Sequence, residues 1–326
     1  MPKSEFRLVN RKLSLLFIIL FLLVWSFCAH INLKFNLDYL KTQDKMPASV
    51  SRQLPLDKGF IQASLNPSLT LERDWSINEP VVSAQAAIIV KMPEDRVLFQ
   101  KNIYQILPIA SLTKIITALV VFDKLELEDK VSINRNMITF YPGLGRLKEG
   151  EKLTVYNLLQ LLLMESSNDA ALALAKEVED KNPNLNFINL MNQKVHQMGL
   201  ENTYFTDPTG YSADNTSNAY DLVNIIKYSL RNSYLWQILG TQEVTFSSID
   251  GQVTHHVINN NHLLRTMSNI LGGKTGYTEE AGQCIVAVSR APNEKGYLIT
   301  VVLHSKDRFE DARTLIEWSE KAYKWQ

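Results

Sequence analysis

Three short polar motifs stand in order along the chain, and together they could carry out acyl transfer. Their residues are Ser111 and Lys114 (S-x-x-K), Ser166 and Asn168 (S-x-N), and Lys274, Thr275 and Gly276 (K-T-G). The first motif offers a hydroxyl nucleophile and an amine on one helix face, because residues three apart share that face. The second offers a hydroxyl and an amide. The third offers a cation and then a glycine, beside which a substrate could approach the backbone closely.

The first motif is expected at the start of a helix. Residues 112–121 have an amphipathic pattern, so Ser111 should lie where free N–H groups and the helix dipole favour developing negative charge. A serine hydroxyl is a poor nucleophile until a base takes its proton. Lys114 can serve if its amine is neutral, which burial and a second cation such as Lys274 would promote. Alone, S-x-x-K more often marks a capping serine and a solvated lysine, and only the other two motifs reverse that preference.

The other two motifs also have simpler explanations. Residues 166–168 form a short connector between two apolar helical segments, where Ser and Asn commonly cap a helix; capping and catalysis are compatible here. Residues 273–275, Gly-Lys-Thr, could suggest a phosphate-binding loop. A Walker motif requires a glycine five residues before its Gly-Lys pair, and Ser268 stands at that position. The sequence therefore argues against nucleotide binding, and it indicates no cofactor.

Composition indicates a globular protein without a nucleic-acid or metal partner. Of 326 residues, 45% are hydrophobic and 21% are charged, as in folded domains. The 34 basic and 34 acidic residues cancel, so nucleic acid is not an expected partner. Cys28 and Cys284 lie in separate apolar runs and imply no disulfide framework. The pair His255 and His256 has no carboxylate or thiol nearby in the sequence, so both are interpreted as strand residues and no metal site is predicted.

The N-terminus predicts export. Residues 1–12 carry four basic side chains and are expected in the cytoplasm, while residues 13–31 form an apolar run of nearly spanning length. We expect an uncleaved single-pass anchor that places the rest of the chain outside the membrane. A signal peptide cleaved near residues 26–28 is the alternative, and it would release the protein to the envelope. Residues 32–80 are proline-punctuated without sustained periodicity, which predicts a flexible extracytoplasmic tether.

Residues 81–326 are predicted to form one catalytic domain of the α/β (α+β) class. Strands are expected at 84–90, 96–99, 284–288 and 297–303, with a hairpin turn at Asp250-Gly251. Between these strand groups the pattern is mostly helical, and Thr154 is a candidate N-cap. A further helix should start at Asn168 or Asp169, and the last should cover 309–325. The pattern predicts a sheet built from both ends of the domain, with a helical block inserted between them.

With these motifs in place, residues 82–326 resemble the penicillin-binding D-alanyl-D-alanine carboxypeptidases, the low-molecular-mass serine DD-peptidases of bacterial cell walls. Besides the three motifs, the likeness covers residues 108–115, 154–173, 198–200, 205–210, 273–278 and 281–282, and Arg308 ahead of 315–318. The resemblance implies a DD-peptidase/β-lactamase-like fold, a mostly antiparallel five-stranded sheet flanked by helices with a helical subdomain. Two departures are Ser167, where many relatives have glycine, and an end soon after the catalytic domain, so the membrane anchor is expected at the N-terminus.

The resemblance also implies catalytic roles. Ser111 would attack the peptide carbonyl between two terminal D-alanines of a peptidoglycan stem peptide and form an acyl-enzyme. Lys114 is our choice for the group that accepts its proton, although the base is disputed among related enzymes. Ser166 and Asn168 would relay the proton and hold the substrate amide. β-Lactam antibiotics would bind as covalent inhibitors.

Substrate-binding roles are implied for the third motif and its neighbours. Lys274 and Thr275, followed by Gly276, would bind the terminal carboxylate with help from Arg308. The oxyanion would lie between the backbone N–H groups of Ser111 and Tyr277.

Three alternatives to a carboxypeptidase remain at this point. An endopeptidase that cuts wall cross-links would use the same site. A β-lactamase needs a glutamate that activates the deacylating water, and no Glu-x-x-Leu-Asn stretch occurs between Asn168 and Lys274. A non-catalytic penicillin-binding module is disfavoured because the residues of all three motifs are intact.

Overall fold

The computed structural model describes residues 71–138, 147–292 and 294–325, and the structural statements below concern these residues. The predicted cytoplasmic segment and membrane anchor, and residues 32–70 of the predicted tether, lie outside them. Within the described part of the chain, no helix is both long enough and apolar enough to cross a membrane.

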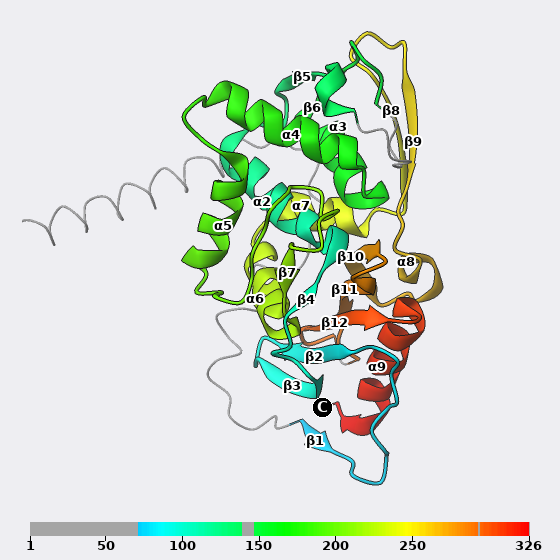
Figure 1. The fold of residues 1–326 in the computed structure, drawn as a ribbon. Helices are drawn as coiled ribbons and strands as arrows, with labels where there is room; N and C mark the ends of the chain where they lie inside the picture. The colour runs from blue at the N-terminus through cyan, green and yellow to red at the C-terminus, as the bar shows by residue number, and fades with distance from the viewer. Residues whose placement is uncertain (1–70, 139–146, 293, 326) are drawn as a thin grey trace, which may run out of the picture. The chain divides into compact units, whose positions relative to one another are not determined.

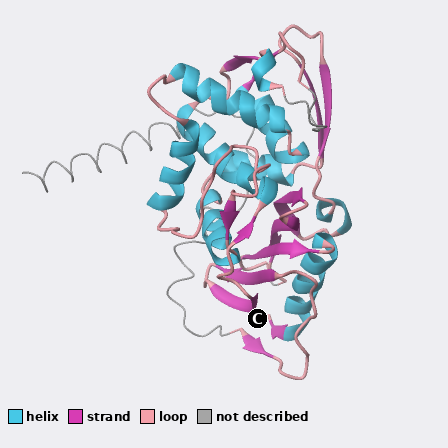
Figure 2. Ribbon diagram, in the orientation of Figure 1, coloured by secondary structure: helices cyan, strands magenta, loops and turns pink. Residues whose placement is uncertain are grey.

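A five-stranded sheet in the order β10-β11-β12-β2-β3 forms the centre of the domain (Figures 1 and 2). The strands are β2 Ala86–Met92, β3 Arg96–Lys101, β10 Ile270–Thr278, β11 Gly282–Arg290 and β12 Tyr297–Ser305. Each neighbouring pair is antiparallel. Strands from both ends of the domain therefore share one sheet, which confirms the predicted fold class.

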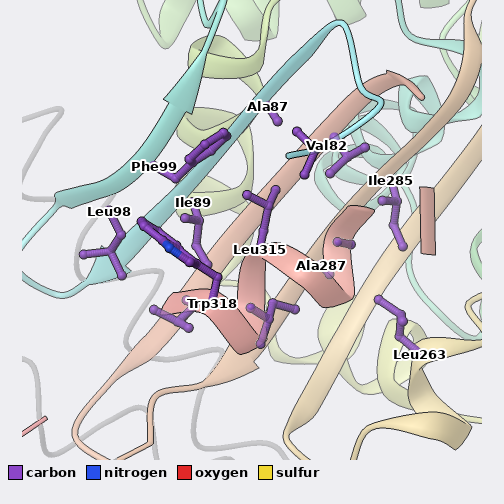
Figure 3. Packing of buried hydrophobic residues seen from close by; sticks show 14 of the residues in the cluster. Val82, Ala87, Ile89, Leu98, Phe99, Leu263, Ile285, Ala287, Leu315 and Trp318 are labelled. Carbon is purple, nitrogen blue, oxygen red and sulfur yellow. The ribbon is translucent and has the colours of Figure 1, made fainter. Parts of the chain in front are cut away.

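Both faces of this sheet are covered, and this explains why its three inner strands, β11, β12 and β2, are apolar runs rather than alternating ones. All seven residues of β2 are buried. Helix α9, Arg308–Ala322, packs on one face, where its Leu315 and Trp318 meet Ile89 and Phe99 of the sheet (Figure 3). Helix α6, Ala219–Ser229, packs on β2 and β12 from the other side (Figure 1).

The helical block lies between the two strand groups in sequence and beside the sheet in space (Figure 1). It contains α2 Lys114–Lys124, α3 Val155–Gln160, the π-helix η4 Leu161–Glu165, α4 Asn168–Lys181 and α5 Phe187–Gln197. The other helices are the 3-10 turns η2 Ala110–Thr113 and η3 Arg135–Met137, with α7 Ser233–Gly240 and α8 Leu263–Thr266. Helix α2 packs against α4 and α5, and α7 packs against β10.

Four two-stranded pairs complete the described fold. They are β1 Glu72–Arg73 with β13 Tyr323–Lys324, β4 Leu107–Pro108 with β7 Thr216–Ser217, β5 Lys130–Ser132 with β6 Lys152–Thr154, and β8 Glu243–Ser247 with β9 Thr254–Ile258. The pair β8/β9 is the predicted hairpin, and Gly251 in its turn has a φ of 73°, a conformation that glycine adopts readily.

The predicted helix starts follow from local capping. The Thr154 hydroxyl accepts a hydrogen bond from the Asn157 N–H at 3.1 Å, which confirms Thr154 as the N-cap of α3. Helix α4 begins at Asn168, one of the two predicted starts, and its cap is Ser167, whose hydroxyl accepts from the Ala170 N–H at 3.1 Å.

The folded domain begins before the predicted boundary at residue 81. Residues 71–80, assigned to the tether, belong to it: Leu71 is in the hydrophobic core, and β1 pairs with β13. Arg73 lies over the Trp318 ring, 4.9 Å from its centroid, and the Trp318 indole donates to the Asn78 carbonyl at 2.8 Å. This stretch lacks periodicity because it is held by pairing with the far end of the domain, not by local preference.

Candidate active site

The first motif lies where the short helix η2 runs into α2. Ser111 is in η2, and Lys114, the first residue of α2, is fully buried. The Lys114 amine, Nζ, lies 3.0 Å from the Ser111 hydroxyl. Ala110, just before the serine, has a φ of 46°, a left-handed conformation that is unfavourable for alanine and is typical of functional sites. The structure therefore brings the proposed nucleophile and base into direct contact.

The second motif is the junction between the π-helix η4 and α4. Ser166 follows η4 in a left-handed conformation, with a φ of 68°. The Asn168 amide oxygen accepts a hydrogen bond from Lys114 Nζ at 2.8 Å, and the Ser166 hydroxyl accepts one from Lys274 Nζ at 2.9 Å. The two ends of this motif thus contact two different lysines.

The third motif lies inside the edge strand β10, which is not among the strands expected from the sequence. Lys274 is 1% exposed, and besides Ser166 its amine donates to the Thr275 carbonyl at 2.8 Å. The sequence suggested that a substrate could approach the backbone at Gly276. In the structure, the segment that carries Ser111 is what lies close to this glycine. A Cβ at this position would lie 3.0 Å from the Ser111 nitrogen and 3.1 Å from the Ile109 carbonyl oxygen. The glycine therefore lets β10 pack against η2.

Arg308 and Tyr277 flank the third motif. Arg308 is the first residue of α9, and its Nη1 donates to the Gly276 carbonyl at 2.7 Å. Its buried Nε has no hydrogen-bond partner among the described residues. Tyr277 is 61% exposed. Thus the arginine holds the strand that carries the motif, and the tyrosine side chain points into solvent.

The site concentrates positive charge in a buried place. Burial lowers the pKa of Lys114 to about 7, against a smaller upward effect of the Asp207 carboxylate. Burial also lowers the pKa of Lys274 well below its ordinary value, and the charges of Lys114 and Arg308 add to this effect. A buried ammonium loses hydration, and neighbouring cations disfavour its charge further. Lys114 can therefore be neutral near pH 7, as a base must be.

Two further residues of the site, Thr209 and Asp207, were not assigned a role from the sequence. The Thr209 carbonyl accepts a hydrogen bond from the Lys114 amine, and Asp207 shapes the loop that carries this carbonyl. The sequence signal for both is the run 205–210, which is part of the family resemblance. A backbone carbonyl has no residue type, so pattern alone could not point to it.

In the described part of the chain, no group of three or more His, Cys, Asp or Glu side chains is placed to hold a metal ion.

Comparison of the sequence with known proteins indicates one family. The family model for D-alanyl-D-alanine carboxypeptidases, peptidase S11, matches residues 74–307. A D-alanyl-D-alanine endopeptidase of Pseudomonas aeruginosa is 33% identical over 244 residues, which are 73% of this chain and 78% of that protein. A D-alanyl-D-alanine carboxypeptidase of Bacillus subtilis is 28% identical over 248 residues, 74% of this chain and 63% of that protein.

Solved structures agree with this assignment. The Streptomyces K15 DD-transpeptidase superposes with a TM-score of 0.69 at 28% identity, over 74% of this chain and 99% of that one. A D-alanyl-D-alanine carboxypeptidase from Mycobacterium tuberculosis superposes with a TM-score of 0.68 at 27% identity, over 76% and 95% of the two chains. The chain therefore belongs to the D-alanyl-D-alanine carboxypeptidase (peptidase S11) family of hydrolytic peptidases.

Proposed function

We propose that the protein is a serine-type D-alanyl-D-alanine carboxypeptidase that removes the terminal D-alanine from peptidoglycan stem peptides. The observation that supports it most is the buried Lys114 amine 3.0 Å from the Ser111 hydroxyl. With a pKa of about 7, this amine is partly neutral at neutral pH. A neutral amine within hydrogen-bond distance can take the serine proton as the hydroxyl attacks.

In the proposed reaction, Ser111 Oγ forms a bond to the carbonyl carbon of the penultimate D-alanine while its proton passes to Lys114. The C–N bond to the terminal D-alanine then breaks, and the leaving amine takes up a proton delivered from Lys114, with Ser166 as a relay. Water then attacks the carbonyl carbon of the resulting ester and gives up a proton to Lys114. The bond between this carbon and Ser111 Oγ breaks, the proton passes from Lys114 to Ser111 Oγ, and the shortened peptide leaves with its new carboxyl group. One water is consumed in each cycle, and both Ser111 and Lys114 return to their starting states.

Substrate would be held from both sides of the scissile bond. Lys274 and Thr275 of β10 would bind the terminal carboxylate, and Arg308 holds that strand through the Gly276 carbonyl. The oxyanion would accept hydrogen bonds from the Ser111 and Tyr277 N–H groups. The close packing of Gly276 on the Ser111 nitrogen supports this, because it brings β10 beside the first N–H of the pair.

A second candidate function is cleavage of cross-links by a DD-endopeptidase. It is favoured by the 33% and 31% identical relatives from Pseudomonas aeruginosa and Escherichia coli, both of which are named D-alanyl-D-alanine endopeptidases. Both reactions cut a bond on the carboxyl side of D-alanine, and they differ in the amine that this bond releases. In either case the strained amide of a β-lactam would acylate Ser111.

We also propose that residues 13–31 anchor the protein in a bacterial cell membrane, with residues 32–326 outside. Four basic residues precede this apolar run in the sequence, and such residues favour retention of the N-terminus in the cytoplasm. A site that acts on the assembled wall must face outward, which fits this orientation.

The nucleophile and the substrate can be tested together. The full chain, purified in detergent, should be labelled covalently by fluorescent penicillin, and Ser111→Ala should abolish labelling while Ser132→Ala, an exposed serine on β5, retains it. Mass spectrometry should show loss of one D-alanine from a stem pentapeptide. Conversion of cross-linked dimers with pentapeptides left intact would favour the endopeptidase, and labelling without any turnover would favour a non-catalytic penicillin-binding module. Labelling that survives Ser111→Ala would refute the nucleophile.

A further inference from the structure

One carboxylate organises the loop that faces the first motif. We call residues 206–215 the Asp207 loop. The Asp207 carboxylate accepts hydrogen bonds from the Thr209 N–H at 2.6 Å and hydroxyl at 2.5 Å, the Gly210 N–H at 2.8 Å, the Ser212 N–H at 2.9 Å and the Asn215 side-chain amide at 3.1 Å. All five donors belong to the loop, and all of them bond to this one carboxylate. They close the loop into a compact turn in which an Asp side chain replaces backbone acceptors.

The Asp207 loop is docked on the start of α2 at several points. The Asn215 carbonyl accepts from the Ile109 N–H at 3.1 Å, and the Pro208 carbonyl accepts from the Thr117 hydroxyl at 2.7 Å. Gly210 packs so tightly that a Cβ there would lie 2.0 Å from the Ala110 carbonyl oxygen. These contacts lie on both sides of Ser111 and Lys114 in the sequence, so the position of the loop is tied to that of the first motif.

The loop contributes two things to Lys114. The Thr209 carbonyl accepts a hydrogen bond from the Lys114 amine, and the Asp207 carboxylate acts on that amine as an opposite charge. Two cations also belong to this site, Lys274 on β10 and Arg308 on α9, and the charges of Lys114 and Arg308 both act on the Lys274 amine. Asp207 therefore opposes the accumulated positive charge of the site from the side of the loop.

We propose that Asp207 is a positioning residue for Lys114: its carboxylate folds the loop that binds the Lys114 amine and sets the charge balance around it. This inference rests on the proposed function, in which neutral Lys114 takes the proton of Ser111. Asp207 itself would touch neither substrate nor the reacting atoms.

The sign of the expected effect follows from the charges. Burial alone would raise the pKa of Asp207, but hydrogen bonds from Thr209, Ser212 and Gly210 outweigh it and the net pKa is lowered. Asp207 therefore stays ionised across the neutral range and raises the pKa of Lys114. Without this charge, Lys114 should lose its proton at lower pH. The acidic limb of the pH profile of the acylation rate should therefore also move to lower pH.

The test is the pH dependence of acylation by a chromogenic β-lactam, measured on the full chain in detergent. With a Lys114 pKa of about 7, the rate at pH 6 should be about a tenth of the plateau. In Asp207→Asn the midpoint of the rise in rate with pH should move down by about one pH unit. The rate at pH 6 should then be about one half of the plateau rate. The plateau should fall as well, because an amide nitrogen cannot accept from Ser212 and Asn215.

Two control variants separate charge from shape. Asp207→Glu keeps the charge with altered geometry, so its plateau should fall while the midpoint stays near the wild-type value. Asp214→Asn removes an exposed carboxylate of the same loop and should leave both unchanged. The midpoint comes from a ratio of rates at two pH values for one preparation, so a partly inactive preparation does not alter it. If Asp207→Asn does not fold, Asp207→Ser, whose hydroxyl can still accept from loop N–H groups, takes its place.

A second measurement does not depend on catalysis. In a Ser111→Ala background, the side-chain NMR signal of labelled Lys114, identified by its loss in Lys114→Ala, should titrate near pH 7 and move down when Asp207 becomes Asn. An unchanged midpoint in both measurements would overturn the role of Asp207 while leaving the nucleophile assignment intact. A wild-type rate without any limb near pH 7 would instead count against Lys114 as the base.

Discussion

At the residue scale, the site depends on two lysines that are buried without a direct ion pair in the described structure. Lys114 donates to Ser111, Asn168 and the Thr209 carbonyl, all of them neutral groups. Neutral acceptors satisfy the amine without stabilising its charge as a carboxylate contact would, so burial remains the dominant influence on its pKa. A lysine can in this way serve as a base near neutral pH.

This predicts that Lys114→Ala lowers the acylation rate by at least about a hundredfold, the usual scale for general acid–base catalysis. In the wild type, the rate should rise with pH through about 7, because the amine is protonated below its pKa and neutral above it. Stopped-flow measurement of β-lactam acylation provides both results, and Lys124→Ala, at the exposed end of α2, serves as the control. Unchanged acylation in a folded Lys114→Ala protein would move the base elsewhere, with Ser166 the next candidate.

At the scale of elements, the hairpin β8/β9 is joined to the helical block by a buried pair. The Glu151 carboxylate, just before β6, lies 2.5 Å from His255 Nε2 on β9, and both side chains are buried. Its other oxygen accepts from the Lys148 N–H at 3.0 Å, and the Phe246 ring stacks on His255. From the sequence, His255 had no nearby carboxylate. Glu151 is distant along the chain and adjacent to His255 in space, so only the fold shows this pair.

Removing one member of this pair should destabilise the domain. Glu151→Ala leaves a buried imidazole and a backbone N–H without their acceptor, so we expect a loss of about 3 kcal/mol in the free energy of unfolding. Glu151→Gln keeps an acceptor and should cost less. Denaturant unfolding followed by circular dichroism measures the difference, with the exposed Glu149→Ala as the control. A Glu151→Ala protein as stable as the wild type would show that this buried pair does not stabilise the domain.

At the scale of the whole molecule, the folded domain closes on itself through its two ends. Strand β1 pairs with β13, and Leu71 joins the core that α9 forms with the sheet. Residues near the start of the domain are therefore fixed by strand pairing and core packing with residues near its end. Any tether must end before residue 71, and a protease that cuts the tether should spare the domain.

We therefore predict that protease added to intact spheroplasts releases a folded fragment that binds penicillin and leaves a short membrane-bound stub. Basic residues ahead of the apolar run 13–31 should keep the N-terminus inside. Gel analysis with fluorescent penicillin and N-terminal sequencing identifies the fragment, and a cytoplasmic marker that stays uncut is the control. Protection of the domain would reverse the proposed orientation. A soluble fragment present before protease is added would show a cleaved signal peptide instead.

Much of the fold was predictable because its determinants are local or periodic. The apolar runs of β2, β11 and β12, the Asp250-Gly251 turn and the Thr154 cap each act over a few residues, and each lies where the pattern predicted. The start of the domain was missed because its residues are held by partners some 250 positions away. The strand environment of the third motif was missed because glycines at 272, 273 and 276 weaken any strand pattern.

The sequence by itself determined which side chains are present for the proposed acyl transfer, their order along the chain and the S-x-x-K spacing that places a serine and a lysine on one face. Only the tertiary structure decided how deeply Lys114 and Lys274 are buried, which of them contacts Ser166, and that Thr209 and Asp207 belong to the site. Burial and long-range charge depend on segments that are far apart in sequence. The physical reason is that a pattern reports residue types and spacing, whereas the pKa of an amine depends on the solvent and charges that folding removes or brings near it.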